Sequence, residues 1–190
     1  EKSVTVNAIT RVFNTNLVDW KAVSGAWDIT DRGVLGSNKG SGDSFYLSDT
    51  YLASDVAWTY EADMFMESGR AAGLLFGVKD PLNPAGHWYC LNSDLEESGG
   101  HFKLFKNTGS QNWSSTAGYG DTFANTTKYR LKVAYDGAGK FTYSAAPYGT
   151  SDFIELGSYT DATFTGGYFG VMTFMSNTSF NNVYLYSEGT

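Results

Sequence analysis

The sequence predicts an all-β protein in which two antiparallel sheets pack face to face as a β-sandwich. Aromatic residues make up 16% of the 190 residues, with 13 Tyr and 13 Phe, and such residues favour strands over helices. About a dozen short strand-like segments follow one another at nearly regular spacing, which is typical of a sandwich. No apolar pattern of helical period extends over the length of a helix.

The chain is expected to form one domain. A length of 190 residues is within the size of a single β-sandwich and sufficient to bury a stable core. Residues 1–15 are predicted to be an entry strand or the end of a linker. Residues 16–190 are predicted to form a single domain. The sequence shows neither an internal repeat nor a second domain in this range.

The clearest strand pattern lies in residues 57–65. Large apolar side chains alternate there with mostly polar ones, which predicts a strand with one buried face: Trp58, Tyr60, Ala62 and Met64 on one side, and Thr59, Glu61, Asp63 and Phe65 on the other. A second apolar run follows at 71–78. Between the two runs, Glu67-Ser68-Gly69-Arg70 is predicted to be a turn that carries one guanidinium. The polar face of the first strand would then present two carboxylates next to Arg70.

The earlier part of the chain predicts short strands separated by turn residues. Residues 19–30 predict two strands about a Ser24-Gly25 turn, with Trp20 and Trp27 as core anchors. Asp31-Arg32-Gly33 is another turn signal, and the Gly- and Ser-rich residues 37–43 predict a loop. The strands next to these turns are expected at 34–36 and 44–47.

The later part continues in the same way. Residues 80–86 contain Pro and Gly and predict a loop. In residues 128–135 apolar side chains alternate with basic ones, and the Gly-containing residues 136–139 predict a hairpin turn after them. Residues 107–125 are a long polar stretch, and loops of this length often serve function. The remaining strands are expected at 87–92, 101–106, 140–145, 153–156, 168–174 and 182–186.

The composition excludes several kinds of partner. A formal net charge of −7 disfavours nucleic acids and anionic membranes, which both need basic patches, and no apolar run is long enough to span a bilayer. An uncharged or weakly charged ligand is expected instead. Cys90 is the only cysteine and lies in an apolar strand, so it is predicted to be a buried, unreactive thiol.

No cofactor is required by the sequence. The two His residues and the one Cys show no spacing typical of a transition-metal site. A structural calcium ion is left open, because loop carboxylates and carbonyls that bind calcium leave little sequence pattern.

Six short motifs occur in an order that resembles one family. They are Trp20…Gly25-Ala26-Trp27, Gly42-Asp43-Ser44-Phe45, Tyr60-Glu61-Ala62-Asp63, Gly69-Arg70-Ala71-Ala72-Gly73, Tyr89…Asn92-Ser93-Asp94 and Phe102-Lys103-Leu104-Phe105-Lys106. Together they resemble the fructan-binding carbohydrate-binding modules of family 66, from Asn16 to Val183. The resemblance implies a concanavalin A-like (LamG-like) jelly roll without catalytic activity.

The resemblance also implies a function. Modules of that family accompany levanases, inulinases and related fructosidases of glycoside hydrolase family 32 and hold a terminal fructose. The chain is therefore expected to bind levan, inulin or fructo-oligosaccharides, to be linked to such a catalytic domain, and to be secreted and extracellular. Sequons at Asn112, Asn125 and Asn177 are compatible with secretion.

Matched motif by motif, the resemblance places five residues at sugar-contact positions: Asp43, Glu61, Arg70, Tyr89 and Asp94. Carboxylates accept hydrogen bonds from sugar hydroxyls and a guanidinium donates them, while an aromatic ring packs against the C–H face of a sugar. Trp113, in the long polar stretch, is a sixth candidate, and Trp88 is an alternative stacking ring. Phe174-Met175 departs from the Trp-Asp pair of some relatives, so specificity could differ here or binding could be lost.

These candidates have structural alternatives. Asp43 could cap a turn, and Asp94 could be merely solvated at the start of a loop. Glu61 and Arg70 could form an ion pair that orients both groups. Tyr89 could belong to the core.

The function has two rivals. One is a lectin-like or adhesin domain for another glycan. The other is a concanavalin-like glycoside hydrolase, in which Glu61 and Asp63, about 6.6 Å apart along one strand face, would be the carboxylate pair.

Overall fold

The computed structural model describes residues 9–11, 20–37, 42–83, 86–95, 102–109, 113–115 and 127–188. Within these ranges the chain forms β-strands and no helix. The strands are β1 (Ile9–Arg11), β2 (Trp20–Ser24), β3 (Ala26–Thr30), β4 (Gly33–Ser37), β5 (Asp43–Leu52), β6 (Trp58–Val78), β7 (His87–Asp94), β8 (Phe102–Thr108), β9 (Trp113–Ser115), β10 (Lys128–Tyr135), β11 (Lys140–Pro147), β12 (Ile154–Thr160) and β13 (Gly167–Glu188).

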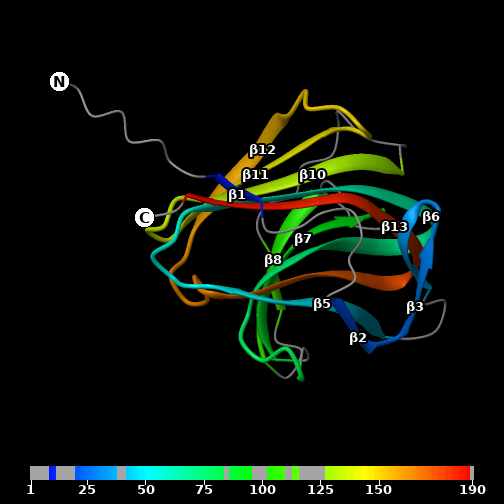
Figure 1. Ribbon diagram of the computed structural model, residues 1–190, viewed down its shortest axis with the longest axis horizontal. Helices are drawn as coiled ribbons and strands as arrows, with labels where there is room; N and C mark the ends of the chain where they lie inside the picture. The colour runs from blue at the N-terminus through cyan, green and yellow to red at the C-terminus, as the bar shows by residue number, and fades with distance from the viewer. Residues whose placement is uncertain are drawn as a thin grey trace.

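Two layers of strands face each other, with β10 to β12 in the upper layer of Figure 1 and β5 in the lower one. The back sheet consists of β12, β11, β10, the first half of β6, the second half of β13, β4 and β3, with β1 beside the end of β13. The front sheet consists of β2, β5, the first half of β13, the second half of β6, β7, β8 and β9. All of these pairings are antiparallel, which confirms the predicted two-sheet antiparallel sandwich.

The long strands β6 and β13 run through both sheets as neighbours. β6 pairs with β10 over residues 58–65 and with β7 over residues 71–76, and it pairs with β13 in both halves. Figure 1 shows both strands passing from one layer to the other at the right-hand end. The predicted turn at Glu67–Arg70 is therefore a bend within a continuous strand. Gly69 permits this bend, because it has a φ of 105° and a Cβ there would lie 2.1 Å from the carbonyl oxygen of Met175.

The core lies between the two sheets and follows the predicted alternation. β6 supplies one row of buried side chains to it through both of its halves: Trp58, Tyr60, Ala62, Met64, Ala72, Leu74 and Phe76. Trp20 is buried in the same cluster and Trp27 packs against it, as predicted. Trp58 contacts the rings of Phe76 and Phe169 edge-on, a geometry that adds to the free energy gained by burying aromatic surface.

A second apolar cluster covers the outer face of the front sheet. Its buried members come from the strands β5, β6, β7 and β13: Phe45, Leu47, Leu75, Val78, Trp88, Cys90 and Met172. Cys90 has no exposed surface, which confirms the predicted buried thiol, and burial raises its pKa well above the ordinary value. This cluster is the floor on which the candidate site lies.

Two further properties of the described ranges bear on function. They contain no helix that is long and apolar enough to cross a membrane. They also contain no group of three or more His, Cys, Asp or Glu side chains that could hold a metal ion.

Candidate functional site

The register of the front sheet aligns polar residues from separate parts of the chain. One row across four strands consists of Asp94 on β7, Ala71 on β6, Phe174 on β13 and Asp43 on β5. Paired residues on neighbouring strands point to the same face of a sheet. Cys90 and Met172, which share that face with Asp94 and Phe174, belong to the outer apolar cluster, so the row lies on the outer face.

Arg70 lies beside this row, next to Ala71 and at the bend of β6. Its Nε donates to both carboxylate oxygens of Asp94, at 3.3 and 3.2 Å. The carbon of its guanidinium lies 5.3 Å from the centre of the Phe174 ring, within cation–π range. The Arg70 side chain is 34% exposed and that of Asp94 only 7%. Of the predicted contacts, Arg70 and Asp94 are therefore brought together directly.

Asp43 lies at the opposite end of the row from Asp94. Three strand spacings of about 4.8 Å separate its backbone from that of Asp94. Its carboxylate is partly buried and makes no hydrogen bond or ion pair with the described residues. Burial raises the pKa of Asp43 from 3.8 to about 6. A partly buried carboxylate without a partner destabilises the fold, and a ligand hydroxyl would supply the missing hydrogen bond.

We expect Asp43→Asn to change how stability depends on pH. Because the pKa of Asp43 in the folded chain, about 6, lies above its ordinary value of 3.8, the unfolded chain releases this proton first. The free energy of unfolding therefore falls as the pH rises through this interval. Thermal midpoints should differ little between the two proteins at about pH 4, and the variant should be the more stable at about pH 8. An equal difference at both pH values would show that Asp43 does not titrate in this way.

Asn92 is a residue that the sequence reasoning did not select. It lies two positions before Asp94 on β7, so it shares the outer face, and its register partner on β6 is Gly73. Asn92 is 5% exposed and its Oδ1 is buried without a hydrogen-bond partner. Such a group is rare in proteins and calls for a ligand or a water molecule. The spacing of two residues from Asp94 was the signal that could have identified it.

Tyr89 points to the other face of β7. It has no exposed surface and packs in the core between the sheets against Phe76 and Phe141. Its hydroxyl donates to Oδ1 of Asp161 at 2.8 Å, and Asp161 also forms an ion pair with Lys106. Burial and the bond to Asp161 raise the pKa of Tyr89. Tyr89 therefore links the front sheet to the segment after β12 through this hydrogen bond. Its role is structural, and it is not one of the residues of the candidate site.

Replacing Tyr89 with Phe tests this assignment. The variant removes one hydroxyl that bonds Asp161 and the backbone N–H of Phe164, and we expect the free energy of unfolding to fall by roughly 1–2 kcal/mol. Affinity for sugar should be unchanged. Urea unfolding and calorimetric titration of the same preparation measure both quantities. If the variant bound sugar more weakly at unchanged stability, Tyr89 would be a sugar-contact residue after all.

Glu61 is not brought to Arg70. Nine residues of one continuous strand, at about 3.3 Å each, place their backbones roughly 30 Å apart along β6. Glu61 instead accepts from Arg130 at 3.1 Å, and Arg130 also pairs with Asp63 at 3.2 Å. Asp63 has no exposed surface and could not reach a substrate as one of a catalytic pair. Both carboxylates thus belong to an ion cluster on the outer face of the back sheet.

The two tryptophan candidates differ in what the structure describes. Trp88 is wholly buried in the outer cluster beneath the site. Trp113 begins β9, which pairs with the edge of β8, and its side chain lies outside the described residues. An open cavity of about 300 Å³ lies elsewhere, and its lining has no charged side chain: Ala57, Trp58, Thr59, Ala134, Tyr135, Tyr186 and Ser187.

Comparison with solved structures relates this arrangement to known proteins. The carbohydrate-binding module CBM66 from Bacillus subtilis superposes with a TM-score of 0.72 and 26% sequence identity, covering 91% of this chain and 98% of that chain. The chain has the fold of a CBM66 module. This finding confirms the resemblance that the six sequence motifs indicated. No protein-family model and no curated protein sequence matches the chain.

Lectin domains share the CBM66-like fold more distantly. The exoplasmic domain of VIP36, in a form bound to Ca²⁺ and Man, has a TM-score of 0.62 and 16% identity, covering 89% of this chain and 82% of that chain. Peanut lectin also has a TM-score of 0.62, with 10% identity over 94% of this chain and 95% of that chain. At these identities the likeness concerns the fold alone.

Proposed function

We propose that the chain is a non-catalytic carbohydrate-binding module that holds the terminal fructose of a fructan. The observation that carries the proposal is the Arg70–Asp94 pair on the outer face of the front sheet. Asp94 shares its row with Asp43, whose carboxylate has no hydrogen-bond or ion-pair partner among the described residues. The similarity to the carbohydrate-binding module CBM66 from Bacillus subtilis supports it.

The chemistry of the site suits a furanose ring. Vicinal hydroxyls would accept from Arg70 and donate to Asp94 and Asp43. Asn92 offers a buried acceptor on the same face. The Phe174 ring, already beneath the guanidinium, can pack against the C–H face of the sugar. A net charge of −7 matches a neutral ligand.

Such a site would bind sugar weakly, and its use would be to hold a linked enzyme close to the polymer. Few atoms of a single sugar are buried, so the Kd should be on the order of millimolar to micromolar. A module of this affinity is useful when it is joined to a fructosidase, because it raises the effective concentration of the enzyme at chain ends. We propose such a linked enzyme of glycoside hydrolase family 32 and an extracellular location.

A second candidate is a module for another glycan. Phe174 and Met175 stand where some family 66 modules carry a Trp-Asp pair, and Phe174 lies in the centre of the site. A carboxylate fewer and a different ring would change which hydroxyls are recognised, so the site could favour another neutral sugar.

Calorimetric titration of the chain with fructose, levan, inulin and a β-glucan tests the proposal, with a reducing-sugar assay in parallel. We expect binding of levan or inulin that free fructose competes away, without release of sugar. Binding of the β-glucan alone would favour the second candidate. Sugar release would contradict the non-catalytic assignment.

A further inference from the structure

Two exposed apolar side chains flank Arg70 in the front sheet. On one side the backbone N–H of Leu95 donates to the carbonyl oxygen of Arg70 at 3.0 Å. On the other side Met175 lies opposite Arg70, because the pairs Phe174–Ala71 and Ser176–Gly69 enclose it in the register. Leu95 is 38% exposed and Met175 42%. We call these two side chains the apolar rim.

Met175 occupies a backbone conformation that its residue type disfavours. Its φ is 50°, in the left-handed region where a residue with a Cβ loses roughly 1–2 kcal/mol relative to the right-handed conformation. The bend imposes this conformation, since the Met175 carbonyl lies against Gly69. Gly or Asn would fit there with less strain. A large exposed side chain kept at a strained position beside a binding site points to a functional role.

We infer that the apolar rim is a second subsite, which takes the sugar ring next to the terminal one. This inference rests on the proposed function. With the terminal ring bound to Arg70, Asp94 and Asp43, a ring that follows it across Arg70 would meet these two exposed side chains. The backbones of Leu95 and Met175 are about 10 Å apart, on the two chain segments that neighbour Arg70.

The apolar side chains of the rim are better suited to contact a second sugar ring than to face water. A furanose ring and its exocyclic CH₂ group present C–H surface, and burying this surface against Leu or Met is favourable without any hydrogen bond. The neutral rim places no charge against the second ring. The site should therefore prefer an oligosaccharide end to a single fructose.

The test compares fructose with a β-linked fructose trisaccharide by calorimetric titration. We expect the unmodified chain to bind the trisaccharide about tenfold more tightly than fructose. Leu95→Ser combined with Met175→Ala should reduce the trisaccharide affinity to that of fructose and leave fructose affinity unchanged. Ile29→Ala is the matched control, because Ile29 is 72% exposed and lies on β3 of the back sheet.

Met175→Gly separates the side chain from the backbone strain. Gly removes the thioether and relieves the strain, whereas Ala removes the thioether and keeps it, so both variants should lose the trisaccharide preference. Loss in only one of them would overturn the subsite assignment. Equal affinity of the unmodified chain for both ligands, or a variant that weakens both equally, would also overturn it while the proposed function stands. If the unmodified chain binds neither ligand, the proposed function fails, and the subsite inference fails with it.

Discussion

Arg70→Ala should abolish detectable binding of fructan ends while the sandwich stays folded. The guanidinium would donate at least two charge-assisted hydrogen bonds to sugar hydroxyls, so its removal should weaken binding about 100-fold or more. For a site of millimolar to micromolar affinity, a change of this size takes binding out of the range of calorimetry. The fold should lose roughly 1.5–3 kcal/mol from the broken bond to Asp94, out of a typical total of about 5–15 kcal/mol.

The controls separate a binding role from a structural one. Arg32→Ala is matched, because Arg32 also pairs with a carboxylate, Glu67, at 2.9 Å, but its side chain is 61% exposed and it lies outside the row of Asp43 and Asp94. It should change neither binding nor stability measurably. Arg70→Lys keeps the charge but not the planar fork, and should retain only part of the affinity. Unfolding of Arg70→Ala, seen by circular dichroism, would make Arg70 structural instead.

Much of the fold could be predicted from local pattern. In residues 58–64 the alternation identified the buried face because every second side chain is large and apolar, and the structure places Trp58, Tyr60 and Met64 in the core. The short strands β2, β3 and β4 were predictable because turn residues separate them. Such features depend on residues that are close together in the sequence. A strand with one buried face therefore shows an alternation of apolar and polar residues that can be recognised directly.

The path of β6 could not be predicted in the same way. Glu67-Ser68-Gly69-Arg70 has the composition of a turn, and nothing local distinguishes a reversal from a bend between two sheets. That distinction depends on β13, a hundred residues later in the sequence, which pairs with β6 on both sides of the bend. The predicted closeness of Glu61 to Arg70 followed from the turn, and it disappears with the continuous strand.

The site shows a similar division. Tyr89 and Asp94 are five residues apart on one strand, so alternation places them on opposite faces; this consequence was available from the sequence. Asn92 shares the face of Asp94 by the same argument. The nearness of Asp43 to this pair was not available, because it depends on the order of four strands in the front sheet.

Arg130→Met is expected to have the largest effect on stability. Arg130 donates to Glu61 at 3.1 Å and to Asp63 at 3.2 Å, and its side chain is only 9% exposed. Burial lowers the pKa of Arg130, but the two carboxylates outweigh this effect and raise it. Removing the guanidinium leaves the carboxylates of Glu61 and Asp63 without their positive partner. Breaking a buried ion pair in this way lowers the free energy of unfolding by about 3–5 kcal/mol. Urea unfolding would measure the change.

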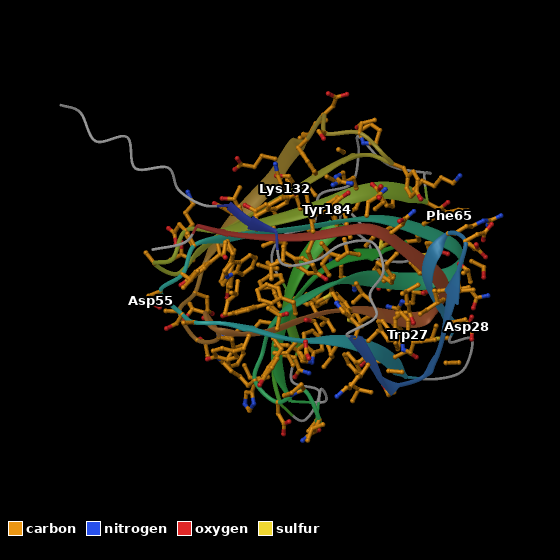
Figure 2. All side chains as sticks on the ribbon, in the orientation of Figure 1. Trp27, Asp28, Asp55, Phe65, Lys132 and Tyr184 are labelled. Carbon is orange, nitrogen blue, oxygen red and sulfur yellow. The ribbon has the colours of Figure 1, made fainter. Side chains whose placement is uncertain are left out.

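Lys132→Met is the matched control for this variant. Lys132, labelled in Figure 2, lies two residues after Arg130 on β10 and therefore shares its face. Its ammonium lies 3.8 Å from the centre of the Phe153 ring, and its loss should cost less than about 1 kcal/mol. Asp63 also accepts from Gly149 N–H and from Asn182 Nδ2, so the cluster fixes the segment after β11 and the bulge in β13. If Arg130→Met were no worse than Lys132→Met, the cluster would not be structural. Glu61 and Asp63 would then again need a functional explanation. A large loss of stability with intact sugar binding would place all of the recognition on the front sheet.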